Sequence, residues 1–331
     1  MKPTDERYMS GKEQSQETGT VTLDAIRAAA ARIAPFVSTT PLVRMTPTGV
    51  SIKAENLHPI GAFKIRGAFN ALLTLSEEER RRGVVAHSSG NHAQAVAYAA
   101  KALGIRATVV MPETSSRLKM EATKRWGAEL VLCSPFGNAR AEVTAKIARE
   151  HGYVVIEPYD SAAIMAGTGT IGLEILAQKP DVKFVFVPVS GGGLIGGLSA
   201  AIIQSDPAIH VIGVEPELAD DGAQSFKARR IVRVPPEDTI RTIADGLRVS
   251  QLGALPWINI QAFVHDIVTV SEDAIRSAMR LIATEAKLVA EPSGAVALAG
   301  ALAAGPDSDR TVAVLSGGNI DLKSYADILA G

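Results

Sequence analysis

The alternation of short apolar segments with helical segments constrains the fold of this chain more than any other feature of its sequence. Continuous apolar runs predict strands, and the Ala-rich or amphipathic segments between most of them predict helices. Strands that are apolar at every position are typical of a mostly parallel sheet covered by helices on both faces. The strands are expected at residues 84–88, 107–112, 129–133, 153–157, 184–189, 210–215 and 311–316. The sequence therefore predicts an α/β fold with mostly parallel sheets.

The N-terminal part of the chain begins with a polar tail. Residues 1–20 contain no apolar segment, so we expect a flexible tail and not a secretory signal. The segment "LDAIRAAAARIAPFV" predicts a helix, followed by the extended "TTPLVRM" and the short strand "SIKAEN". A second helix is expected over residues 67–75, and Ser76 with Glu79 forms the capping box of a third.

Composition and charge exclude several classes of protein. The uncharged stretch at residues 184–205 has the length of a membrane span, but its five glycines and one proline predict strand, loop and helix instead. The formal net charge of -1, without basic clusters, does not fit a nucleic-acid binder, so a small-molecule substrate is expected. Cys133 is the single cysteine, which excludes an internal disulfide and fits a reducing, cytoplasmic compartment.

One lysine has an unusual setting. Lys64 lies in "IGAFKIRGAF", between a phenylalanine and an isoleucine, with glycines on both sides. Such an apolar, tightly turning segment either buries an ammonium group at a cost or lowers its pKa for use as an amine. On this stretch alone, a surface lysine that reaches water along its own stem remains the alternative.

Three of the predicted strands end in polar or glycine-rich turns. "SSGNH", residues 88–92, leads into a helix whose free N–H groups suit a carboxylate or phosphate. "SGGGLIGG", residues 190–197, lets backbone amides converge on a phosphate, and it fits neither the Walker nor the dinucleotide-binding pattern. "SGGNID", residues 316–321, adds a hydroxyl and an amide. Each turn alone also fits ordinary capping or packing. Together with an amine, they are the parts that hold pyridoxal phosphate and present an amino acid to it.

A series of motifs in this chain resembles the serine/threonine dehydratase and serine racemase family, in the same order, from about Leu23 to Asp321. The motifs are "KAEN", "GAFKIRGA", "SSGNHAQ", "VMPE", "AGTGT", "PVSGGGLIGG", "GVEPELADD", "TIADGL", "EPSGA" and "LSGGN". The resemblance implies the tryptophan-synthase-β-like pyridoxal phosphate fold (fold type II), with two three-layer α/β/α domains. It implies a larger cofactor-binding domain of residues 21–76 and 161–331, and a smaller mobile domain of residues 77–160. A homodimer is also implied, and no C-terminal regulatory domain is expected.

The resemblance also assigns roles to individual residues. It makes Lys64 the Schiff-base lysine and the base that removes the α proton of the substrate. It implies that Asn91 contacts the ring hydroxyl of the cofactor, that Ser316 contacts the pyridine nitrogen, and that Glu291 lies near the ring. The residues implied for the phosphate are Ser190, Gly191, Gly192 and Gly193. It places on the substrate side Ser88, Ser89, His92, Arg140 and Tyr159, and in racemising members Ser89 is the acid on the opposite face.

The motif "EPELADD" suggests a metal site. Glu215, Asp221 and the carbonyl oxygen of Ala219 resemble the divalent-cation site of serine racemase-like members, and such oxygen ligands suit Mg²⁺ or Ca²⁺. By spacing alone, a solvated acidic turn after a strand fits equally.

The activity implied is that of a dehydratase, which converts a β-hydroxy-α-amino acid to a 2-oxo acid and ammonia. L-Threonine and L-serine are the default substrates. The alternatives are a serine racemase, a dehydratase for 3-hydroxyaspartate, phenylserine or a hydroxyectoine-related compound, and a non-catalytic amino-acid-binding protein on the same fold. Ala62, "EPY" at 157–159 and Thr168 depart from the family's usual serine, His-Pro-Phe and glutamine. These departures affect the identity of the substrate more than the type of reaction.

Overall fold

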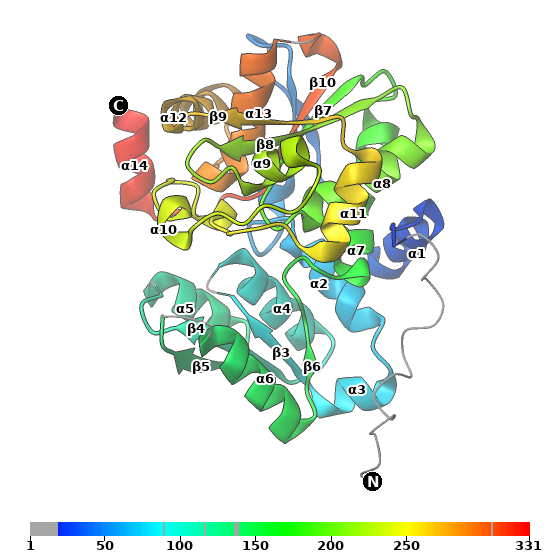
Figure 1. Ribbon diagram of the computed structural model, residues 1–331, viewed down its shortest axis with the longest axis vertical. Coiled ribbons are helices and arrows are strands. Elements are labelled where there is room, and N and C mark those ends of the chain that lie inside the picture. Colours follow the sequence, from blue (N-terminus) through cyan, green and yellow to red (C-terminus); the bar gives the residue numbers. More distant parts are fainter. Residues whose placement is uncertain (1–18, 89, 116, 136–138, 306) are drawn as a thin grey trace.

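The computed structural model describes residues 19–88, 90–115, 117–135, 139–305 and 307–331. Two sheets organise these residues (Figure 1). The first has six strands in the order β1-β2-β10-β7-β8-β9, and the second has four in the order β5-β4-β3-β6. Within the described ranges, β1 and β2 pair antiparallel and the other neighbours pair parallel. The predicted α/β fold with mostly parallel sheets is therefore confirmed.

The strands lie close to the positions expected from the sequence. They are β1 Leu42–Arg44, β2 Ser51–Ala54, β3 Val84–His87, β4 Ala107–Pro112, β5 Glu129–Cys133, β6 Val154–Val155, β7 Phe184–Pro188, β8 His210–Pro216, β9 Asp266–Val270 and β10 Thr311–Leu315. β6 is shorter than expected. β9 was not predicted, because this edge strand has exposed polar residues among its apolar ones.

Helices connect the strands. They are α1 Leu23–Ile33, α2 Lys64–Leu73, α3 Glu77–Arg82, α4 Asn91–Ala102, α5 Arg117–Arg125, α6 Ala139–His151, α7 Ala162–Gln178, α8 Gly193–Ser205, α9 Asp221–Ala228, α10 Pro236–Thr239, α11 Ala254–Phe263, α12 Glu272–Leu281, α13 Pro292–Ala304 and α14 Leu322–Ala330. Four short helical turns are η1 Glu55–Leu57, η2 Asp245–Leu247, η3 Ile282–Ala286 and η4 Ser308–Arg310. Within the described ranges, no helix is both long and apolar enough to cross a membrane.

Local sequence signals explain several helix starts. The capping box forms as predicted, since Ser76 Oγ accepts from the Glu79 amide at 3.2 Å and Glu79 Oε2 accepts from the Ser76 amide at 2.8 Å. α2 begins at Lys64, three residues before the start expected from the sequence. Residues 184–205 form strand, loop and helix, with Gly192 in the left-handed region (φ 89°) as the N-cap of α8.

Close packing of α7 fixes the relative positions of α2 and α8. A Cβ atom on Gly197 of α8 would lie 2.1 Å from the carbonyl oxygen of Met165 in α7. A Cβ atom on Gly167 of α7 would lie 2.6 Å from the carbonyl oxygen of Arg66 in α2. Only glycine permits these backbone approaches. The helix that begins at Lys64 and the helix that follows the glycine-rich turn are thus held against one shared helix.

The helix α2 lies between the two sheets (Figure 1). Its Ile65 and Phe69 belong to the same hydrophobic core as Val84 of β3 and Val109 of β4. The Ala62 bridge to Gly317 places the start of α2 against the end of β10, in the other sheet. Lys64 therefore lies where the parts of the chain that carry the two sheets meet.

Candidate active site

Lys64 is held in a defined, largely apolar position. The Phe63 amide donates to the carbonyl oxygen of Ser316 at 3.0 Å, next to the Ala62 bridge to Gly317. The Nζ atom of Lys64 donates to the carbonyl oxygen of Pro158 at 2.7 Å and lies 5.1 Å from the centroid of the Phe63 ring. Burial lowers the pKa of Lys64 to about 8. The description as a surface lysine does not fit this position.

Two side-chain amides and a carboxyl group form a hydrogen-bonded chain that ends at Ile60, in the segment before Lys64. Asn91, the first residue of α4, donates through Nδ2 to Glu291 Oε1 at 2.7 Å. Its Oδ1 accepts from Asn319 Nδ2 at 2.8 Å, and Asn319 also donates to the carbonyl oxygen of Ile60 at 2.7 Å. Burial, together with the charge of Asp245, raises the pKa of Glu291 to about 8. Asn319 had no predicted role, although it belongs to the "LSGGN" motif.

The glycine-rich turn contacts Tyr159. A Cβ atom on Gly191 would lie 2.4 Å from ring carbons of Tyr159, and one on Gly193 would lie 2.8 Å from its Cβ. In the described structure no side chain caps α8, which leaves its first N–H groups free for a phosphate. A hydrogen bond from α7 also holds the turn, because the hydroxyl of Thr168 donates to the Gly193 carbonyl at 2.9 Å. The glycines of this turn are therefore needed for packing against Tyr159 as well as for the predicted approach of backbone amides to a phosphate. The same packing places Tyr159 against the predicted phosphate turn.

The "SSGNH" turn is only partly described. Ser89 lies outside the described residues, while Ser88 Oγ accepts from the Gly90 amide at 3.1 Å. His92 is buried, and its Nε2 lies 3.0 Å from the carbonyl oxygen of Ile156. Burial, followed by the charge of Lys64, lowers the pKa of His92 to about 3. Its imidazole is therefore neutral, with Nε2 as donor, and Nδ1 has no hydrogen-bond partner among the described residues.

The remaining predicted residues come from several elements. Ser190 follows β7 and the buried Ser316 follows β10, so both lie at the carboxyl ends of neighbouring parallel strands, where ligands bind in open α/β sheets. Arg140 is exposed in the first turn of α6. Burial raises the pKa of Tyr159, and the positive charge of Arg140 opposes that rise.

Glu215 and Asp221 form a buried pair of carboxylates. Glu215 accepts from the amides of Gly222 at 3.2 Å and Ala223 at 2.8 Å. Both oxygens of the buried Asp221 carboxylate lack a hydrogen-bond partner in the described structure. Burial raises the pKa of Asp221 to about 7. Burial, followed by the negative charge of Asp221, also raises the pKa of Glu215. Among the described residues, no three His, Cys, Asp or Glu side chains cluster as metal ligands do. A third ligand would therefore be a backbone oxygen, such as that of the buried Ala219.

An extended ion network that the sequence did not reveal anchors α2. Arg66 Nε and Nη2 donate to the two oxygens of Glu55 at 2.7 and 2.8 Å, and Nη1 donates to Glu174 Oε1 at 2.7 Å. Lys53 Nζ donates to Glu174 Oε2 at 2.6 Å. The sequence feature that could have indicated this network is the second cation, Arg66, in the apolar stretch around Lys64.

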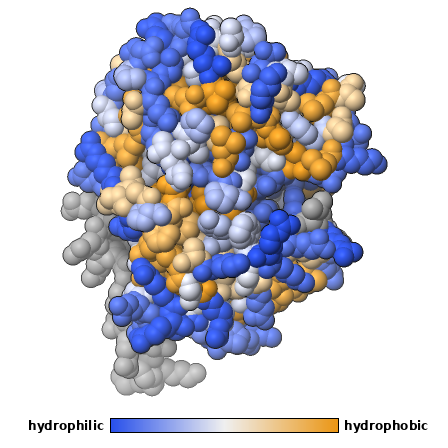
Figure 2. Space-filling model, turned by 180° about the vertical axis from the view of Figure 1, so that it is seen from behind, coloured by the Kyte–Doolittle hydropathy of each residue, from blue (hydrophilic) through white to orange (hydrophobic). Residues whose placement is uncertain are grey.

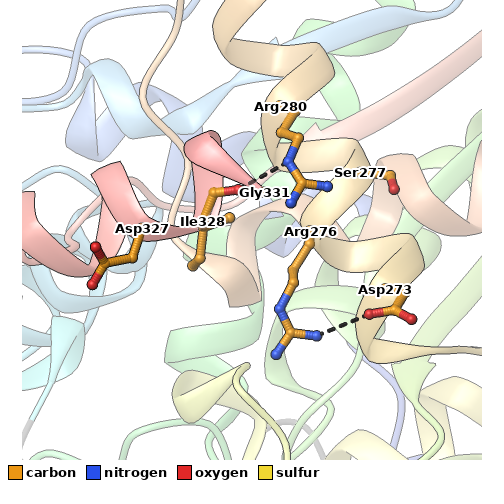
Figure 3. Close-up of a pocket in the computed structure, with 7 residues that line it drawn as sticks. All are labelled: Asp273, Arg276, Ser277, Arg280, Asp327, Ile328 and Gly331. Carbon is orange, nitrogen blue, oxygen red and sulfur yellow. Dashed lines mark hydrogen bonds and ion pairs between the residues drawn. The ribbon is translucent and has the colours of Figure 1, made fainter.

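Two hollows on the described surface bear on the search for the substrate pocket. The larger, ≈ 510 Å³, lies between α12 and α14 (Figure 3), where Arg280 Nε donates to the Ile328 carbonyl at 2.9 Å and Arg276 pairs with Asp273 at 3.2 Å. None of the predicted site residues lines it. The smaller, ≈ 360 Å³, is lined by residues that include Tyr159 and Pro158, whose carbonyl holds Lys64. The smaller hollow is therefore the candidate substrate pocket.

Known proteins resemble this chain over most of its length. Residues 33–317 match the family described as pyridoxal-phosphate dependent enzyme. The chain is 39% identical over 308 residues to L-threo-3-hydroxyaspartate ammonia-lyase from Saccharomyces cerevisiae, covering 91% of this chain and 94% of that protein. It is 40% identical over 321 residues to a catabolic L-threonine dehydratase from Staphylococcus aureus, covering 93% and 92%. The structure of maize serine racemase matches with a TM-score of 0.89 at 38% identity, covering 94% of this chain and 97% of that one. The chain therefore belongs to the pyridoxal-phosphate dependent enzyme family, with the fold-type II architecture of its structural relatives.

Proposed function

We propose that this enzyme is a dehydratase (ammonia-lyase) that converts a β-hydroxy-α-amino acid, by default L-threonine or L-serine, to a 2-oxo acid and ammonia. The observation that carries the proposal is the Lys64 amine, whose pKa is lowered to about 8. It stands where β10 ends, within hydrogen-bond distance of the Pro158 carbonyl. A neutral amine at this place suits both covalent attachment of the cofactor and removal of an α proton.

The residues of the site fit pyridoxal phosphate. We propose that Lys64, Asn91, Ser190, Gly191, Gly192, Gly193 and Ser316 hold it, with Glu291 near its ring. The uncapped start of α8 supports the phosphate assignment, since its free N–H groups and helix dipole favour an anion. When bound, the cofactor withdraws electrons from the α-carbon of the substrate and so makes the α proton removable.

The protein supplies the acid and base groups. Lys64, once free, accepts the α proton, because its lowered pKa leaves about a tenth of the amine neutral at pH 7 and more at higher pH. Ser316 offers a neutral hydroxyl and no carboxylate. Glu291 retains its proton near neutral pH, because burial raises its pKa to about 8. Ser88, His92 and Arg140 remain proposals for the substrate side, as does Ser89. The neutral His92 offers a hydrogen-bond acceptor at Nδ1 and no positive charge.

An assay of products tests the proposal. The purified holoenzyme should release equimolar ammonia and 2-oxo acid from L-serine or L-threonine, and chiral analysis should find no D-serine in the residual substrate. Accumulation of D-serine would favour the racemase alternative. Ammonia only from 3-hydroxyaspartate, phenylserine or a hydroxyectoine-related compound would change the substrate but not the reaction. If none of these compounds released ammonia, the dehydratase proposal would be wrong.

We also propose a Mg²⁺ or Ca²⁺ ion at Glu215, Asp221 and the Ala219 carbonyl. Two buried carboxylates, one with both oxygens unpartnered among the described residues, carry a desolvation cost that a cation would offset. Adding the cation to EDTA-treated protein should raise the melting temperature by about 5 °C, because an ion bound only by the folded state stabilises it.

Two variants make this test specific. Asp221→Asn should remove the response of the melting temperature to Mg²⁺ and Ca²⁺. Glu217→Gln changes an exposed carboxylate in the same turn and should keep the response. An equal response in both variants, or none in the unaltered protein, would contradict the metal assignment.

The homodimer and the mobility of residues 77–160 remain proposals. On the face shown in Figure 2, hydrophobic side chains form patches over both the upper and the lower half of the molecule. An apolar surface of this kind suits contact with a second copy of the chain. Light scattering coupled to size-exclusion chromatography should give twice the chain mass of 34.7 kDa.

A further inference from the structure

The candidate substrate pocket lies where two strands of the smaller sheet end. β3 ends at His87, and β6 is followed by residues 157–160. Both parts line the pocket, together with Ile231 and residues 251–254. Because β3 and β6 pair in parallel, their carboxyl ends lie at the same edge, which is where ligands bind in open α/β sheets.

The wall at residues 157–160 also contacts the proposed reaction centre. The Pro158 carbonyl accepts from Lys64 Nζ at 2.7 Å, and the Tyr159 ring lies against Gly191. Asp160 holds the other end of this segment, since its two oxygens accept from the amides of Ala254 and Leu255 at 3.0 and 2.9 Å. The side chain of a substrate that reacts at Lys64 would therefore face a wall whose position is fixed at several points.

The pocket lining is acidic. It contains the carboxylates of Glu157 and Asp160, the imidazole of His87, and neither lysine nor arginine. Asp160 is already engaged by the two amides of α11. Glu157 Oε2 lies 3.8 Å from His87 Nε2, which is close enough for an ion pair with a protonated imidazole but too far for a hydrogen bond, and the Glu157 side chain is 45% exposed. The Glu157 carboxylate is thus available to a ligand.

The charges around Tyr159 also indicate a negatively charged pocket. Besides burial, the negative charges of Asp160 and Glu157 raise the pKa of this residue, and the positive charge of Arg140 lowers it. Arg140, one of the residues proposed for the substrate side, does not line this pocket. A second carboxylate on the substrate would therefore meet Glu157 without a lysine or arginine in the pocket lining to compensate it.

We infer that Glu157 makes this enzyme select β-hydroxy amino acids with a neutral or positively charged side chain, and reject those with a second carboxylate. The inference rests on the proposed dehydratase function and narrows its substrate class. It separates this chain from the relative named for L-threo-3-hydroxyaspartate, although the two are 39% identical. The physical basis is like-charge repulsion at a half-exposed site, which discriminates modestly but consistently between substrates.

A pair of substrates equal in size and different in charge tests the inference. For the holoenzyme at pH 8, kcat/KM for 3-hydroxyasparagine should exceed that for 3-hydroxyaspartate of the same stereochemistry by about tenfold. Glu157→Gln should bring the ratio close to one, chiefly through a lower KM for 3-hydroxyaspartate. Glu142→Gln, which removes an exposed carboxylate of α6, should keep the original ratio.

The possible outcomes separate this inference from the proposed function. Equal or faster turnover of 3-hydroxyaspartate, or an unchanged ratio in Glu157→Gln, would overturn the role of Glu157 even if ammonia is released. If neither these compounds nor L-serine and L-threonine release ammonia, the dehydratase proposal fails. In that case, dissociation constants of the same two compounds, measured by calorimetry, still decide the inference. Tighter binding of 3-hydroxyasparagine supports it, and equal or tighter binding of 3-hydroxyaspartate overturns it.

Discussion

Replacing Lys64 with alanine is expected to lower turnover of a β-hydroxy amino acid by about 10⁴-fold, because it removes both the proposed attachment point and the proposed base. Ammonia release by the purified variant measures this loss. Lys101→Ala is a matched control, since Lys101 is an exposed lysine near the end of α4 and should leave turnover unchanged.

The pKa of Lys64 adds a signature that does not depend on turnover. Only the neutral amine attacks the cofactor aldehyde, and the pKa of Lys64 is lowered to about 8 by burial. The rate at which cofactor-free protein takes up pyridoxal phosphate covalently should therefore rise with pH and level off above about 8. An ordinary lysine would continue to gain reactivity up to about pH 10.

Chemical trapping decides whether Lys64 is the attachment point. Borohydride reduction of the holoenzyme, followed by mass spectrometry of its peptides, should find the cofactor on the peptide that contains Lys64. A label on a different lysine, or full activity of Lys64→Ala, would show that the assignment is wrong.

Arg66→Met is expected to lower the free energy of unfolding by about 3–5 kcal/mol, because it leaves the buried carboxylate of Glu55 without its bidentate partner. Burial alone would raise the pKa of Glu55, but the charge of Arg66 and the contact with His58 hold that pKa well below its ordinary value. A carboxyl whose pKa is lowered by folding stabilises the folded state above its unfolded pKa. This contribution is therefore present at neutral pH and is lost as the pH falls into the acidic range.

Urea unfolding at pH 7 measures the effect of Arg66→Met. Arg82→Met is the control, because Arg82 pairs with Glu78 at 2.8 Å on the surface, where such a pair contributes about 1 kcal/mol or less. The double variant Arg66→Met/Glu55→Gln should recover part of the lost stability, since it removes the unpaired charge. Equal losses in Arg66→Met and Arg82→Met would contradict a structural role of the buried network.

Local sequence patterns were enough to predict the fold class and the turns that carry the candidate site residues. Fully buried parallel strands need apolar residues at every position, so β4 and β10 were visible as continuous apolar runs. The capping box at Ser76 and the glycine N-cap of α8 follow from local backbone chemistry, which involves only a few neighbouring residues. The ordered motifs then led to the enzyme family, which the comparisons confirm.

The contacts between residues far apart in the chain could not be predicted from such patterns. Asn91 and Glu291 are 200 residues apart, and Arg66 and Glu174 are 108 apart, yet each pair is within hydrogen-bond distance. The contact of Tyr159 with Gly191, and the acidic pocket that Glu157 lines, likewise depend on how the end of β6 faces the glycine-rich turn. Local patterns encode the conformation of a segment because its own residues set its dihedral angles and exposure. They do not encode which buried charge compensates another, because that depends on the packing of the whole chain.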